Sequence, residues 1–343
     1  MMWLTWRQFR AQAIAAAAAL AALTAVLVVT GLHLTYLYAA SGVSACQAHG
    51  DCGTLASDFI SQVKSTSDEL LFYAGIVVMY AAPAIIGVFW GAPLITRELE
   101  AGTFRLAWNQ SVTRARWIAV KLGLTGLAAR ATAGLLSLLI TWWAAPLFRA
   151  AELATSSSVS ISRLEPPLFG AGGIAPVGYA AFAFALGVTA GLLIRRTIPA
   201  MAITLAAFAA IQVVMPQWVR PHLIAPLQKT VPLSVASIQE LEVGRNGSML
   251  LIGHPPGIPG AWILSNQTIT PAGHVFTGPA TQACQTGSFQ ACNAWLAGKH
   301  LRELISYQPA SRYWAFQWYE TAIFIALALA LAGFCYWRVR RLS

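Results

Sequence analysis

The sequence predicts an all-α polytopic membrane protein with six transmembrane helices, an N-terminal amphipathic interfacial helix, and a small extracytoplasmic domain between helices five and six. Three observations support this fold class. Hydrophobic residues make up 57% of the chain and charged residues 10%, whereas soluble domains carry about 25% charged residues. Six apolar runs approach or exceed the roughly 20 residues that a helix needs to cross the hydrocarbon core. One face of the membrane would carry twelve lysines and arginines against two acids, whereas the other face would mix charges of both signs.

The six apolar runs are expected to be helices, because a backbone in lipid must satisfy its polar groups internally. Strands of membrane barrels are near 10 residues long with strict alternation, and these runs show neither property. The first run is longer than the apolar core of a secretory signal and has no convincing cleavage site, so we expect it to be retained. The runs cover about residues 13–37, 70–95, 117–147, 176–194, 198–215 and 318–337.

The distribution of charge indicates the orientation in the cell membrane. With six spans, both termini share one face, and there only Glu98 and Glu100 oppose the basic residues. Short loops rich in lysine and arginine stay in the cytoplasm, so we expect both termini to be cytoplasmic. The net charge of +10 then reflects topology, and no nucleic-acid partner is expected. The basic residues of this face are Arg7, Arg10, Arg97, Arg105, Arg114, Arg116, Lys121, Arg195, Arg196, Arg338, Arg340 and Arg341.

The segments outside the spans define four regions. Residues 1–12 are predicted to form a cytoplasmic amphipathic helix with Trp3, Trp6 and Phe9 at the membrane interface. Residues 13–215 would hold helices one to five, and residues 216–313 the extracytoplasmic domain. In that domain we expect strands near 248–252 and 262–270 and a helix over about 289–305. Residues 314–343 would form helix six and a basic cytoplasmic tail.

Four of the five cysteines fall outside the membrane in two close pairs: Cys46, Cys52, Cys284 and Cys292. This placement suits an oxidising exterior, and we expect each pair to form a local disulfide. Four free thiols are the alternative. A zinc site that uses the nearby His49 or His300 is less favoured, because the spacings match no usual ligand pattern. The fifth cysteine, Cys335, lies inside the last span.

The link between the second and third spans, residues 96–116, carries the most informative pattern. A charged helical start is followed by a Gly-Thr break and a second amphipathic turn. Such a segment would lie along the membrane surface and offer a rigid knob to a partner. The alternative is that its acids only solubilise the loop and pair with neighbouring arginines. The pattern consists of Arg97, Glu98, Glu100, Gly102, Thr103, Arg105 and Arg114.

This pattern resembles the coupling segment of ABC export permeases, the six-span subunits that work with a separate ATPase, and is most similar to actinobacterial drug-export permeases. The amphipathic start, the six spans and the enlarged loop before the last span are also similar. The chain departs from the family at Gln110 and Ser111, where a proline is common. The resemblance implies that these seven residues couple the permease to a cytoplasmic ABC ATPase, with a second permease copy completing a homodimer or heterodimer in membrane lipid.

The chain contains no Gly-x4-Gly-Lys-Ser/Thr loop, the sequence that cradles nucleotide phosphates. We therefore expect ATP and Mg²⁺ to bind the partner ATPase, and no enzyme activity, cofactor, metal or catalytic residue in this chain. An intramembrane enzyme is disfavoured because no catalytic set appears. The aromatic and apolar spans favour an amphipathic cargo, a drug or lipid-like molecule, and thus multidrug efflux. A membrane signalling or assembly protein with a ligand-binding extracytoplasmic domain is the alternative from another class.

Two further features within the spans each leave two interpretations open. Arg130 lies inside the third run, where a charge suggests a role in a substrate path or a side chain that snorkels to the headgroups. The pairs Gly87/Gly91 and Gly187/Gly191 permit close helix approach. The two interpretations are that the helices approach each other within one chain, or that helices of two copies of the chain do so.

Overall fold

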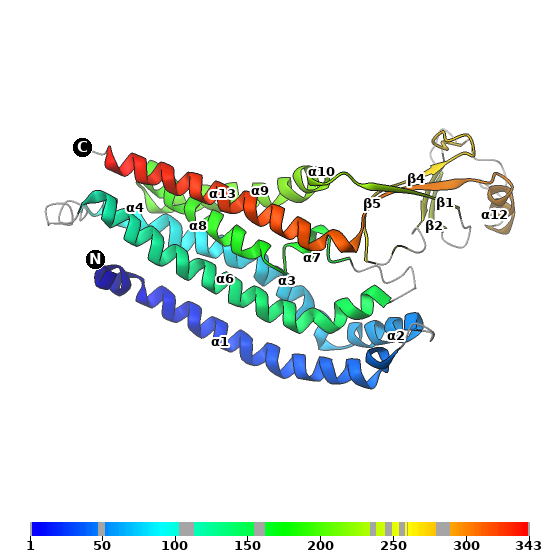
Figure 1. Cartoon of the computed structure of the whole chain (residues 1–343), viewed down its shortest axis with the longest axis horizontal. Coiled ribbons are helices and arrows are strands. Elements are labelled where there is room, and N and C mark those ends of the chain that lie inside the picture. Colours follow the sequence, from blue (N-terminus) through cyan, green and yellow to red (C-terminus); the bar gives the residue numbers. More distant parts are fainter. Residues whose placement is uncertain are drawn as a thin grey trace.

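The computed structural model describes residues 2–46, 52–102, 113–153, 162–233, 238–243, 249–253, 258, 260–278 and 289–341. In this part of the chain, six helices are long and apolar enough to cross a membrane, which confirms the predicted number. They lie side by side in an elongated bundle, with the strands beyond one end (Figure 1). The six candidate spans are Thr5–Ala40, Asp68–Glu100, Arg114–Leu153, Ala175–Ile194, Thr197–Leu223 and Ala310–Arg340.

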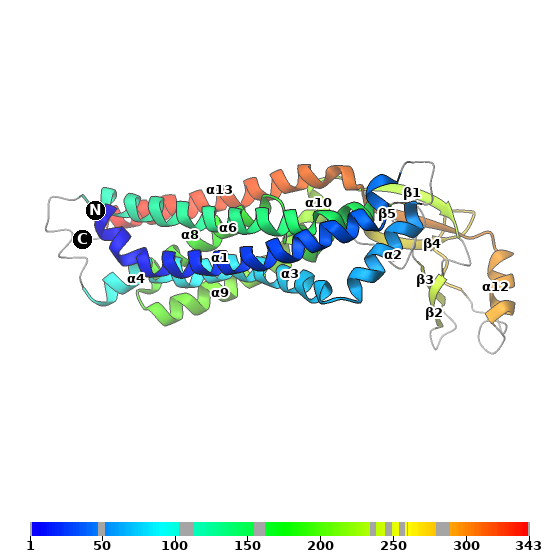
Figure 2. The same ribbon diagram turned by 90° about the horizontal axis from the view of Figure 1, so that it is seen from below.

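Both chain termini lie at one end of the bundle, which we call the terminal end, and the strands lie at the other, the domain end (Figure 2). The second span and the fifth span are each built from three consecutive helical segments, and the middle segment of the fifth is a π-helix, η3. The main helices are α1 (Met2–Ala40), α3 (Ser67–Ile85), η2 (Ile86–Gly91), α4 (Ala92–Glu100), α6 (Arg114–Leu153), α8 (Ala175–Ile194), α9 (Thr197–Val214), η3 (Met215–Val219), α10 (Arg220–Leu223) and α13 (Tyr313–Arg340). Shorter helices are η1 (Val43–Ala45), α2 (Cys52–Lys64), α7 (Pro166–Phe169), α12 (Phe289–Ala297) and η5 (Ala310–Arg312).

Helix α8 is the centre of the bundle and packs against α13, α6, α4, η2 and α9. The π-helix η2 presents Gly87 and Gly91 to α8, and α8 presents Gly187 in return. A Cβ atom built on Gly187 would lie 2.8 Å from the backbone nitrogen of Ala92, and it would meet the carbonyl oxygen of Gly87 even more closely. The two glycine pairs therefore pack against each other within one chain, as the intrachain interpretation predicted.

The N-terminal segment differs from the expected arrangement. Helix α1 is continuous from Met2 to Ala40, so residues 1–12 do not form a separate helix. Trp3 and Trp6 are exposed, as an interfacial position requires. The prediction for Phe9 is wrong, since its ring is buried edge-on against Trp90 with centroids 4.9 Å apart. The start of α1 is thus anchored to the second span by an aromatic contact.

The domain end contains a three-stranded antiparallel sheet in the order β1-β5-β4, so the fold is mostly helical rather than all-α. In its register, Tyr307 of the central strand faces Leu227 on one side and Ile263 on the other. A separate two-stranded pair joins β2 and β3. The strands are β1 (Leu227–Pro232), β2 (Ile238–Val243), β3 (Met249–Gly253), β4 (Trp262–Ile269) and β5 (Arg302–Gln308).

Strands β3 and β4 confirm the two expected strands. The helix expected over 289–305 is present only in its first part. Helix α12 ends at Ala297, and His300 follows in a left-handed conformation with φ of 48°, which a helix does not tolerate. Residues 302–308 then form β5 because both neighbouring strands bond to them. Pairing across the sheet, which a local pattern does not contain, decides the conformation of this segment.

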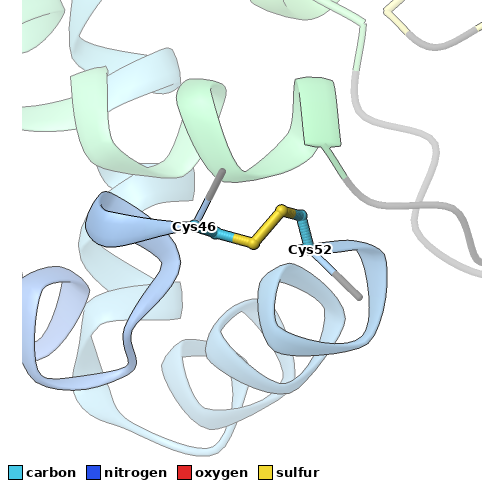
Figure 3. The surroundings of a disulfide bond; sticks show 2 residues. All are labelled: Cys46 and Cys52. Carbon is cyan, nitrogen blue, oxygen red and sulfur yellow. A yellow bond between two sulfur atoms is a disulfide. The ribbon is translucent and has the colours of Figure 1, made fainter. Parts of the chain in front are cut away.

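The first predicted disulfide is present. Cys46 follows η1 and Cys52 begins α2, and the bond between them holds their Cα atoms 5.8 Å apart (Figure 3). Cys292 on α12 is also disulfide-bonded, whereas Cys284 lies outside the described residues. The bridge between Cys284 and Cys292 therefore stays a prediction.

Candidate functional site

The described parts of the predicted coupling segment, residues 96–102 and 113–116, lie at the terminal end of the bundle (Figure 1). Helix α4 stops at Glu100, and Gly102 follows with φ of 67°, a conformation that favours glycine. Thr103 and Arg105 lie outside the described residues. Helix α6 starts at Arg114, and the hydroxyl of Thr113 accepts the backbone N–H of Arg116 at 3.3 Å, as a helix cap does.

Glu98 joins three helices at this end. Its Oε1 atom lies 2.5 Å from the Nζ atom of Lys121 on α6 and accepts a bond of 2.9 Å from Gln8 on α1. Lys121 is 3% exposed, and its ammonium lies 4.9 Å from the ring centroid of Trp117. Because Lys121 is buried, the loss of Glu98 would leave an unpaired charge among apolar groups. Glu98 thus holds α1, α4 and α6 together.

Glu100 joins α4 to a fourth helix. Its carboxylate accepts the backbone N–H of Thr197 at 2.8 Å and the hydroxyl of Thr197 at 2.6 Å. Thr197 is the first residue of α9, where a negative charge is favoured by the helix dipole and by unpaired N–H groups. Both acids of the coupling segment therefore have partners inside the chain, and they tie the ends of the spans to one another.

The basic residues of the segment are placed differently. Arg97 is exposed and lines a hollow of about 190 Å³ between α1 and α4 with Gln8 and Gln12. The Nε2 atom of Gln12 donates a bond of 2.9 Å to the carbonyl oxygen of Phe89 in η2. Arg114 is half-buried at the start of α6. Arg97 thus offers an exposed positive charge near the end of α4.

Arg130 lines none of the hollows of about 190, 210, 290 and 610 Å³ among the described residues. Its side chain is exposed on α6, and its Nε atom donates to the carbonyl oxygen of Gly126 at 3.2 Å, one turn nearer the terminal end. No carboxylate lies within 4.0 Å of it among the described residues. This direction is that of a snorkelling side chain, so the geometry favours the snorkelling interpretation over the substrate path.

A buried charged pair near the domain end is not predicted by the sequence, which assigns Arg220 to the extracytoplasmic domain of residues 216–313. Arg220 on α10 and Glu320 on α13 are 1% and 0% exposed. The Nε and Nη2 atoms of Arg220 lie 2.8 and 3.0 Å from the Glu320 carboxylate. Tyr179 of α8 donates to that carboxylate at 2.5 Å, and the guanidinium lies 4.0 Å from the ring centroid of Phe169. The available signal was Glu320 itself, an acid inside an apolar run.

The family model described as "ABC-2 membrane transporter related" matches residues 17–220, more than half of the chain. The chain belongs to this family. It is an ABC-2 type permease, and six candidate spans agree with a multi-pass membrane protein. No curated protein and no solved structure matches it.

The matched region of the permease covers most of the first and fifth candidate spans, the three spans between them and the predicted coupling segment, and it ends at Arg220. The strands and α13 lie beyond it. The Arg220–Glu320 pair therefore connects the last matched residue to a helix outside the match.

Proposed function

We propose that this permease is the membrane-spanning subunit of an ATP-driven ABC exporter, of the actinobacterial drug-export type. It would move an amphipathic drug or lipid-like substrate outward, with a separate ATPase subunit and a second permease copy. Membership of the family supports a permease role. The observation that carries the proposal further is the linkage of four spans at the terminal end by Glu98 and Glu100.

The linkage supports coupling because a force must pass through contiguous contacts to move helices. A partner that presses on residues 96–116 would move α4 and α6 directly, since the segment joins them. It would also move α1 through Gln8 and α9 through Thr197. ATP and Mg²⁺ would stay on the partner, which closes on nucleotide and shifts the bundle between inward and outward states.

The proposed orientation places the terminal end in the cytoplasm. We expect a cysteine replacing Val275, which is 55% exposed at the domain end, to react with a membrane-impermeant maleimide in intact cells. A cysteine replacing the exposed Ala101 should react only after the cells are permeabilised. The natural Cys335 is buried and provides a low background. The opposite labelling pattern would show that the termini face outward.

The coupling proposal is tested best at Arg97, because reversal of Glu98 or Glu100 would also break contacts within the bundle. We expect Arg97→Glu to lower the amount of ATPase that co-purifies with the tagged permease by roughly tenfold, since a reversed charge at an interface repels its partner. The ATPase is identified by mass spectrometry of the parent complex, and its recovery is measured by quantitative immunoblot.

The matched control is Arg195→Glu, a reversal at another exposed arginine of the terminal end, in the two-residue link between α8 and α9. This variant should recover the ATPase at the parent level. If Arg97→Glu behaves like the control, residues 96–116 do not bind the ATPase at this point. If no ATPase accompanies the parent permease, the signalling or assembly alternative is favoured instead.

A further inference from the structure

Three hollows lie one after another along the bundle, and helices α1, α3 and α6 all contribute to the first two. The largest, about 610 Å³, lies nearer the terminal end. Apart from Gln12 and Thr132, it is lined by apolar residues, among them Leu23, Phe89 and Leu136. Ile85 and Phe89 on its edge are 51% and 52% exposed, so the groove opens sideways between the helices. At the level of the spans, a side opening of this kind faces lipid rather than water.

A second hollow follows one helical turn farther along the same helices. It measures about 290 Å³ and is lined by Leu27 of α1, Gly75 of α3 and Ile140 of α6. Leu27 and Ile140 each lie four residues beyond Leu23 and Leu136, which line the first hollow, the groove. Arg149 and Arg163 line this cavity at its other end. The volumes of the two hollows together fall in the range of about 300–1,000 Å³ that is typical of small-molecule sites.

A third hollow of about 210 Å³ shares four lining residues with the second: Phe148, Arg163, Tyr313 and Trp314. It also contacts Gly260 and Ala310, which border the strands. The series therefore begins between apolar helices and ends beside the domain.

The charges at the domain end of the series are unbalanced. Glu152 is the only acid among the described residues that line the second and third cavities. It lies 3.8 Å from Arg163, whose Nε atom is buried without a hydrogen-bond partner and whose guanidinium lies 4.8 Å from the ring centroid of Phe148. Arg149 has no carboxylate within 4.0 Å in the described part of the chain. One cation is left in excess beside an apolar cavity.

We propose that this series binds an anionic amphiphile taken from the membrane. The apolar chain would occupy the groove and the second cavity, and the anionic headgroup would bind Arg149 and Arg163. A soluble anion would leave the apolar walls unfilled, and a zwitterion would bring a second positive charge to the arginines. The proposal rests on the proposed function, since it names the class of substrate that the permease would carry, but its test measures binding alone.

The test uses the purified full-length permease in phosphatidylcholine nanodiscs and three probes with matched parts. Dodecyl phosphate carries the chain and the anionic head, dodecylphosphocholine carries the same chain with a zwitterionic head, and inorganic phosphate carries the anion alone. A photoreactive dodecyl phosphate is crosslinked, and the labelled peptides are mapped. We expect labelling of α1, α3 and α6 that unlabelled dodecyl phosphate displaces at least about tenfold more effectively than the other two probes.

Two variants address the two halves of the site. Arg149→Gln with Arg163→Gln should weaken labelling by roughly tenfold, the loss expected for charge-assisted hydrogen bonds. Gly75→Leu should fill the second cavity and abolish labelling there, because a Cβ at Gly75 meets only Ile140 Cγ2, at 3.9 Å. The controls are Lys64→Gln, at an exposed residue of α2, and Gly123→Leu, where a Cβ meets nothing within 4 Å. Both should label like the parent.

Equal displacement by dodecylphosphocholine would overturn the anionic headgroup, and equal displacement by phosphate would overturn the role of the chain. Unchanged labelling in the double arginine variant would overturn the placement of the site. These outcomes are independent of ATPase recovery in the Arg97 experiment, so loss of this proposal and loss of the exporter assignment are distinguishable.

Discussion

Replacement of Glu320 by alanine should destabilise the permease by about 3–5 kcal/mol, because it leaves Arg220 charged and unpaired inside the bundle. Arg220 is 1% exposed, and its guanidinium donates two hydrogen bonds to this carboxylate. Desolvation of an unpaired charge is the largest single penalty that a substitution can introduce in such a site. The measurement is thermal unfolding in detergent, followed with a maleimide dye that reacts with the buried Cys335 as the helices separate.

Two matched variants separate the charge from the shape of the site. The double variant Arg220→Met with Glu320→Leu removes both charges and keeps most of the volume, so it should unfold close to the parent temperature. Tyr179→Phe removes a bond of 2.5 Å to the carboxylate and should cost roughly 1.5–3 kcal/mol. If the double variant is as unstable as Glu320→Ala, packing rather than charge explains the loss, and the pair has no special electrostatic role.

Replacement of Gly187 by leucine should be similarly damaging, with a loss of about 3 kcal/mol or more. The new side chain would enter the contact between α8 and η2, where the nearest atoms belong to the backbone of Gly87 and Ala92. Backbone atoms in a helix cannot turn aside as a flexible side chain does, so the two helices must separate. The same Cys335 dye assay and the yield of monodisperse protein measure the effect.

The control for Gly187→Leu is a substitution that should raise the stability of the permease instead of lowering it. Gly123 lies within α6 with nothing within 4 Å of a built Cβ, so Gly123→Ala should raise stability by roughly 0.5–1 kcal/mol through helix propensity alone. A Gly187→Leu variant that unfolds at the parent temperature would show that α8 and η2 are not held in this close contact.

The sequence was sufficient for features that depend on local composition. Hydropathy alone located six spans, because each run of about 20 apolar residues has one stable state in a membrane. The short spacing of Cys46 and Cys52 was sufficient to predict their bond. The glycine pairs predicted a close contact between helices, and the structure shows that the contact is between η2 and α8.

The sequence does not predict features that depend on which helices are neighbours in space. The pairing of Glu98 with Lys121 crosses 23 positions, that of Glu100 with Thr197 crosses 97, and that of Arg220 with Glu320 crosses 100. A pattern read along one chain contains no distance between such residues. The helix that the sequence predicts over 289–305 overlaps strand β5 for the same reason, since the partner strands β1 and β4 decide the conformation of β5.

The fifth span is fastened at its two ends to different helices. At the terminal end, Thr197 is bonded to Glu100 of α4, and at the domain end Arg220 is bonded to Glu320 of α13. Between these points, 22% of its most apolar window is buried, against 78% for α8. A rod that is pinned at both ends and loosely held between them converts any relative movement of its anchors into bending or torsion. The softest place for that strain is η3, where Pro216 interrupts the hydrogen-bond ladder.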